Sequence, residues 1–211
     1  RQWSRGLGDV YKRQYLELAI SYYNRGLIKE AITILEIGPD ELINDIWKAY
    51  LKEDREELIN SISSKKIDFS FPFRRESMKI LEWAKNTSSS WKLDYLLSLN
   101  LWGKGRYTEA QNLLIGIKDI SDNHLFYLIR GLILNKLGID PRNDFIKAYE
   151  LDNKNWRVSR ALSDYHFSNG NYNLSNDILR RAFNNDKSNY IIGMDYVETL
   201  VKLEKFSSAI S

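Results

Sequence analysis

Apolar residues along the chain recur with a helical period, and turns interrupt them at regular distances. In three segments an apolar stretch ends at a glycine, a small residue follows five positions later, and a leucine comes four positions after that. The three sets are Gly26, Ala31 and Leu35; Gly105, Ala110 and Leu114; and Gly170, Ser175 and Leu179. A helix that ends in a left-handed glycine before a second periodic stretch predicts a helix hairpin, and the small residue lets its two helices pack closely.

Two further segments carry weaker copies of this pattern. Residues 127–152 keep Gly138 but leave a shorter stretch between the helices, and residues 193–211 place Glu204 at the turn. The turns at 105, 138, 170 and 204 are 33, 32 and 34 residues apart, whereas 79 residues separate 26 from 105. Two units fit into that gap if one is degenerate. Residues 41–62 match such a unit, with Asp54 where the glycine is expected.

A period near 34 residues with this pattern resembles the tetratricopeptide repeat. One such unit cannot bury its apolar face alone, so neighbouring units stack. We therefore expect an all-α fold, a right-handed superhelical solenoid of tetratricopeptide-like helix hairpins with one degenerate unit and one irregular segment. The irregular segment is 68–95, where Pro72 precedes a predicted helix over 77–85 and a loop follows at 86–90.

The predicted repeat domain covers residues 15–211. Its units lie at about 15–38, 41–63, 72–117, 124–152, 156–186 and 190–211, of which the second is degenerate and the last truncated. Because the last unit stops early in its second half, we expect the chain to be a fragment of a larger bacterial protein, incomplete at both ends.

Residues 1–14 lack the helical period of the following segment. One choice of codons for SRGLGDVYKRQ (4–14) resembles an adaptor used in sequencing libraries, so we expect 1–14 to be a non-native segment, disordered or a frayed helix. The alternative is a native basic arm. Four basic residues and one acidic residue lie there, and the chain has 31 basic and 28 acidic residues, so the rest carries 27 of each. The net charge of +3 then gives no support to nucleic-acid binding.

The order of several segments is more particular than the repeat. FPFRRESMKILEWA, SWKLDYLLSLNLWGKGR and NWRVSRALSDYHF follow one another in a series similar to the repeat region of a family of large bacterial proteins. Proteins of that family carry an uncharacterised domain, related to the galactose-mutarotase sandwich, ahead of the repeats. The resemblance implies a carbohydrate-related context for a preceding domain and no activity for these residues.

The sequence contains no recognisable catalytic or metal-binding constellation. His124 and His166 are 42 residues apart, without a partner at metal-ligand spacing, and His166 stands where the first unit has Tyr22, which favours a core or boundary histidine. The chain has no cysteine, which excludes a disulfide framework and a cysteine nucleophile. We expect no catalytic, cofactor-binding or metal-binding residues in this chain, and no cofactor. Tryptophans at 47, 83, 91, 102 and 156 can stack on sugars, although core packing explains most of them.

The favoured interpretation is a non-catalytic scaffold for protein interaction or domain packing. Its partner is a protein segment or the missing N-terminal domain, with no nucleic acid and no membrane span. The alternative is an accessory helical region of a carbohydrate-active or sugar-binding protein. The compartment stays open between bacterial cytoplasm and periplasm. Candidate contacts are first-helix residues that point away from the second helices: Tyr23, Asn24, Tyr95, Trp102, Leu128, Asn135, Arg157, Arg160, Asp164 and Phe167.

Overall fold

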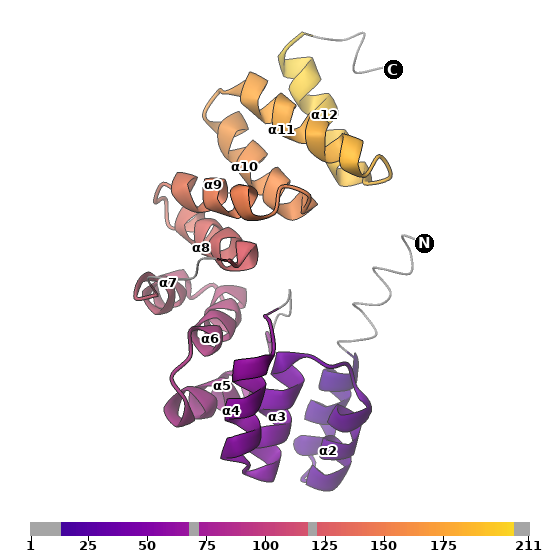
Figure 1. The fold of residues 1–211 in the computed structure, drawn as a ribbon, viewed down its shortest axis with the longest axis vertical. Coiled ribbons are helices and arrows are strands. Elements are labelled where there is room, and N and C mark those ends of the chain that lie inside the picture. The colour runs from indigo at the N-terminus through magenta and orange to yellow at the C-terminus, as the bar shows by residue number, and fades with distance from the viewer. Residues whose placement is uncertain (1–13, 68–71, 118–121, 205–211) are drawn as a thin grey trace. The chain divides into compact units, whose positions relative to one another are not determined.

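The computed structural model describes residues 14–67, 72–117 and 122–204, and within them every regular element is an α-helix (Figure 1). The chain forms two compact units, residues 1–117 and residues 118–211. The adaptor-like segment lies outside the described residues except for Gln14, which belongs to a helix described over 14–23.

The first unit is built from helix hairpins and one additional helix. After the helix over 14–23 come α2 (Ile28–Ile37), α3 (Leu42–Lys52), α4 (Arg55–Ser64), α5 (Arg75–Thr87), α6 (Trp91–Gly103) and α7 (Tyr107–Ile115). Within the pairs α3/α4 and α6/α7 the second helix packs against the first. Helix α5 belongs to neither pair and packs against both α3 and α6. The predicted irregular segment therefore contains a helix inserted between two repeats.

The second unit continues as a series of helices, each packed against the next. They are α8 (His124–Lys136), α9 (Arg142–Leu151), α10 (Trp156–Ser168), α11 (Tyr172–Asn185) and α12 (Tyr190–Lys202). Leu179, Ala182 and Ile192 form a buried cluster between α11 and α12, with Trp156 and Phe183 among the side chains packed against it.

The predicted turn residues adopt the left-handed conformation. Gly26, Gly105, Gly138 and Gly170 have φ between 72° and 77°, and Glu204 has φ 58°. The degenerate unit differs by one position, because its left-handed residue is Glu53, with φ 55°, and not Asp54. Asp54 is the N-cap of α4, and its carboxylate accepts the Glu57 N–H at 2.9 Å. That bond determines where α4 begins, so the reversal occurs at the residue before the cap.

In three hairpins the second helix packs against the first at one small residue. Ala31, Ala110 and Ser175 are fully buried, as predicted. In the α8/α9 hairpin the small residue lies on the first helix and the large residue on the second. Phe145 lies four residues after the N-cap, where α2, α7 and α11 have the small residue, and Gly131 on α8 leaves room for its ring. A Cβ atom at Gly131 would lie 2.6 Å from that ring.

Hydrogen bonds from two neighbouring helices hold α5 in place. The Trp47 indole N–H of α3 donates to the Ser77 hydroxyl at 3.2 Å, and the Asn100 amide of α6 donates to the Arg74 carbonyl at 2.9 Å. The predicted inward residues Ile80, Leu81 and Ala84 are fully buried. This anchoring determines where α5 places Trp83.

Candidate functional site

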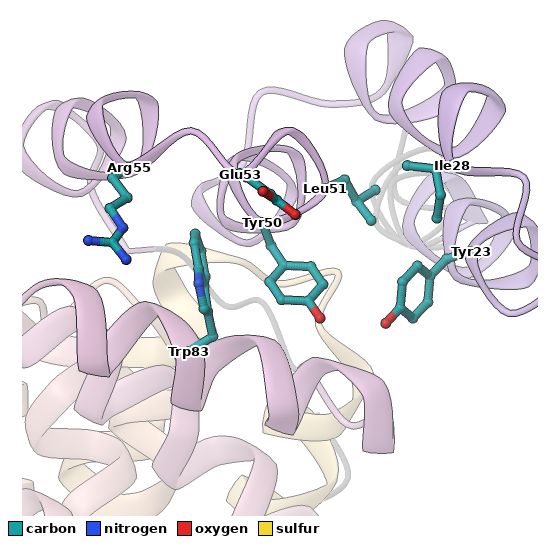
Figure 2. A pocket seen from close by; sticks show the side chains of 7 residues that line it. All are labelled: Tyr23, Ile28, Tyr50, Leu51, Glu53, Arg55 and Trp83. Carbon is teal, nitrogen blue, oxygen red and sulfur yellow. The ribbon is translucent and has the colours of Figure 1, made fainter.

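An open pocket of about 500 Å³ lies at the turn end of the first two hairpins (Figure 2). The Tyr50 ring lies between those of Tyr23 and Trp83, with centroid distances of 6.4 Å and 5.2 Å (Figure 2). We name these three side chains the aromatic row. The pocket is completed by Ile28, Leu51, Glu53 and Arg55.

The aromatic row comes from three helices. Tyr23 and Tyr50 each lie three residues before the left-handed turn residue of their hairpin, so they hold equivalent positions in successive repeats. Trp83 comes from the inserted helix α5. Hydrogen bonding with Tyr50 and then burial raise the pKa of Tyr23. Behind the row, the fully buried Trp47 ring meets Tyr23 edge-to-face at 5.5 Å, which links the row to the core.

Charged residues border the aromatic row. A second opening, of about 440 Å³, shares Arg55 and Trp83 with the first and is also lined by Lys79 and Glu82. Glu53 is a further charged residue in the lining of the first pocket, next to Tyr50 (Figure 2). An aromatic centre surrounded by polar and charged groups is the usual arrangement of a protein-recognition surface.

The second unit has its own pocket, of about 410 Å³, between the ends of α8 and α10. Two carboxyl groups line it, Asp140 in the turn before α9 and Asp164 on α10. Its walls include the rings of Phe145 and Tyr165, whose centroids are 6.4 Å apart. The remaining lining residues are Leu132, Asn135, Gly138, Ile139, Pro141, Ala161, Ser168 and Asn169. We name this the acidic pocket.

The ionised form of the Asp164 side chain is unfavourable in this position. Desolvation raises the pKa of its carboxyl group to about 6; the charge of Arg160 opposes this rise, and the charges of Asp195 and Glu198 add to it. The side chain is nevertheless 60% exposed, because the pocket is open to solvent. Arg160 is the main group that lowers this pKa, but its guanidinium is shared, since it lies 2.7 Å from the Asp195 carboxylate and 4.0 Å from that of Asp164.

Two of the predicted contact residues belong to the core. Tyr95 is 0% exposed and Leu128 is 1% exposed, so neither forms a binding surface. Tyr95 lies on α6, where every residue from 95 to 101 is buried and where α5 and α7 both pack. Leu128 lies on α8, which is apolar on most of its sides and contacts both α9 and α10. The prediction assumed one open side on each first helix, and these two helices have none at those positions.

The other predicted residues divide between pockets and local contacts. Tyr23 lines the first pocket, and Asn135 and Asp164 line the acidic pocket. Trp102 is half-buried and Asn24 donates to Glu76 at 2.7 Å. The remaining three make contacts with nearby side chains. The Arg157 guanidinium lies 4.6 Å from the centroid of the Trp156 ring, and Arg160 pairs with Asp195. The half-buried Phe167 ring lies 5.1 Å from that of Tyr172. The structure therefore brings Asn135 and Asp164 together in one pocket and places Arg160 4.0 Å from Asp164.

Sequence reasoning missed Tyr50 and Trp83 as partners of Tyr23. Placing the degenerate turn at Asp54 shifts the equivalent of Tyr23 to Leu51. The signal that identifies the correct turn is the capping sequence Asp54–x–x–Glu57, which marks Asp54 as an N-cap. Trp83 lies on a helix outside the repeat, so no repeat position predicts it.

The histidines have structural surroundings. The His124 Nε2 atom lies 3.2 Å from the side-chain amide of Asn155, the N-cap of α10. Burial lowers the pKa of His166, whose ring meets that of Tyr165. Among the described residues, no group of three or more histidine or acidic side chains is placed to hold a metal ion. No helix in that part of the chain has the length and apolar character needed to cross a bilayer.

No family model matches this sequence, and neither does any curated protein. Solved structures do resemble the fold. The structure of PilF from Pseudomonas aeruginosa has a TM-score of 0.60 at 16% identity, covering 96% of this chain and 88% of its own. A thermophilic TPR protein of Thermus thermophilus has a TM-score of 0.54 at 15% identity, covering 90% and 99%. YrrB, described as a TPR protein with an unusual peptide-binding site, has a TM-score of 0.54 at 15% identity, covering 86% of each chain. The predicted all-α helical-repeat solenoid of tetratricopeptide type is thereby confirmed.

Proposed function

We propose that this chain is a protein-interaction scaffold that binds an extended segment of a partner protein across the aromatic row. The observation that supports this function is the convergence of Tyr23, Tyr50 and Trp83, from three helices, on one open pocket. Half-buried aromatic side chains held rigidly by the core lose little entropy on binding, and such residues dominate the affinity of protein interfaces. The fold shared with YrrB, which is described with a peptide-binding site, adds to this support.

The geometry of the row favours a peptide over a sugar. Its neighbouring rings meet edge-to-face, at 73° for Tyr23 with Tyr50 and 77° for Tyr50 with Trp83. Successive rings at steep angles form notches that accept apolar side chains, whereas a sugar ring stacks on an open aromatic face. The charged side chains of Glu53 and Arg55 at the rim are suited to polar groups of a peptide.

Selection from a displayed random-peptide library on the complete chain tests this function. We expect enriched peptides that bind measurably by calorimetry, and we expect Trp83→Ala or Tyr50→Ala to weaken their binding about 10-fold or more. Tyr190→Ala is the matched control, because Tyr190 is an aromatic residue 77% exposed on α12 and outside the pocket. Circular dichroism verifies that each variant is folded.

Two results would contradict the proposal. One is a set of enriched peptides that bind the Trp83→Ala and wild-type proteins equally. The other is the absence of peptide binding together with a response to an oligosaccharide panel that Trp83→Ala removes. The second result would favour the carbohydrate-associated alternative.

A further inference from the structure

We propose that the acidic pocket of the second unit binds the side chain of a lysine or arginine of a partner protein. This inference extends the proposed function, because it assigns a chemical class to part of the partner. It concerns a pocket in the other compact unit, so the two sites are tested separately.

The shape of the acidic pocket suits a long aliphatic side chain with a polar end. Leu132, Ala161 and the rings of Phe145 and Tyr165 form its apolar lining, and its volume is about 410 Å³. Lysine and arginine bury their methylene stems along such surfaces while the charged end remains near water.

The charge of the acidic pocket is complementary to a cation. Asp140 and Asp164 approach it from different elements, the turn before α9 and helix α10, and none of the described lining residues is cationic. The Asn135 amide and the Ser168 hydroxyl add further polar groups. Lysine carries three N–H donors and arginine five, which matches a lining rich in acceptors.

The cations close to the acidic pocket do not neutralise it. Arg160 is 2.7 Å from Asp195, which leaves only a 4.0 Å contact with Asp164. Arg142, the first residue of α9, is exposed; its charge partly opposes the raised pKa of Tyr165 and, after burial, contributes to the lowered pKa of His166.

Negative charges from two other elements, α12 and the turn before α9, lie near Asp164. Asp195 and Glu198 on α12 act on Asp164 directly, and Asp140 lies in the lining and hydrogen-bonds to Tyr165, whose pKa burial and this bond raise. A cationic side chain placed among these carboxylates stabilises the ionised form of Asp164. Binding should therefore release a proton and weaken as the pH falls below about 6, the pKa of Asp164 in the free protein.

Nuclear magnetic resonance of the complete chain tests the inference with short acetylated alanine peptides that carry one central lysine, arginine, glutamine or glutamate. At about pH 7.5 we expect the lysine and arginine peptides to shift the backbone amides of Leu132, Asn135 and Tyr165 saturably. The glutamine and glutamate peptides should leave these amides unchanged. At about pH 5 the affinity for lysine and arginine should fall several-fold.

Asp164→Asn should reduce binding of the lysine peptide about 10-fold, and Asp140→Asn gives a second, independent reduction. Asp177→Asn, at an exposed aspartate on α11 outside the pocket, should have no effect. Trp83→Ala should leave these shifts intact, which separates this site from the aromatic row. The inference is overturned if the glutamate peptide binds equally, if both pocket variants bind normally, or if calcium chloride shifts the same amides while the lysine peptide does not.

Discussion

Asp144 and Asp164 show how two carboxylates in one unit take different roles. The Asp144 side chain is 7% exposed, and both of its oxygens accept hydrogen bonds from Arg130, at 2.6 Å and 2.8 Å. This pair links α8 to α9 and leaves no accessible charge. Asp164 is 60% exposed in the acidic pocket and shares Arg160, 4.0 Å away, with Asp195. An acid with a satisfied partner contributes to the fold, whereas the carboxyl group of Asp164 remains largely exposed to solvent.

The cost of ionising Asp164 predicts a pH-dependent stabilisation by Asp164→Asn. The native pKa of about 6 lies above the ordinary 3.8, so between these values the native state binds more protons than the unfolded state. The free energy of unfolding therefore decreases as the pH rises through this window and stays lower above it. The variant should melt at a higher temperature than the wild type at about pH 7.5, and the difference should vanish below about pH 4.

Differential scanning calorimetry at both pH values measures this difference. Because the side chain is largely exposed, solvent screening keeps the gain modest. Asp177→Asn is the control. A gain of equal size at both pH values would show that the stabilisation does not come from the charge of Asp164.

The α3/α4 hairpin shows how an element tolerates the loss of the repeat glycine. Glu53 adopts a left-handed conformation that a Cβ atom disfavours, and the N-cap Asp54 and the packing of α3 hold it there. Asp45 on α3 also forms ion pairs with Lys48 on the same helix and with Lys65, the C-cap of α4. Its side chain is 6% exposed, and although burial acts against ionisation, hydrogen bonds from Lys48 and Lys65 lower its pKa. Tertiary contacts compensate here for an unfavourable local sequence.

Glycine substitutions at Glu53 and Asp54 test the position of this turn. Glu53→Gly should raise the free energy of unfolding by up to about 1 kcal/mol, because it removes the strain of a positive φ. Asp54→Gly should not raise it, because the N-cap hydrogen bond to Glu57 is lost. Urea unfolding measures both. The reverse order would place the turn at Asp54, as the repeat pattern alone predicted.

At the scale of the whole molecule, the division into two compact units limits how far a local change extends. Each unit has its own buried residues, and repeat arrays are coupled mainly through neighbouring units. The two pockets lie in different units, one lined by the aromatic row and the other acidic. We therefore expect changes in one pocket to leave the other intact.

Gly131→Ala tests this independence by overpacking α8 against α9. The new methyl group would lie 2.6 Å from the Phe145 ring, and we expect a loss of about 1–3 kcal/mol. Hydrogen exchange should show weaker protection in α8, α9 and α10 and unchanged protection in α2 to α5. Gly116→Ala is the control, because no atom lies within 4 Å of its Cβ position. Equal loss of protection in both units would show that the chain unfolds as one cooperative body.

The sequence by itself determined the all-helical class, the left-handed turns at Gly26, Gly105 and Gly170, and the buried small residues after them. These features are local, because a helical period and a glycine turn depend on residues only a few positions apart. Only the tertiary structure decided that Tyr95 is core and that Trp83 joins Tyr23 and Tyr50. The inserted helix α5 explains both findings. It packs on α6, which carries Tyr95, and it also packs on α3, which carries Tyr50, and so brings Trp83 to that hairpin. The environment of Asp164 likewise depends on α8 and α12, which surround α10 only once the chain is folded.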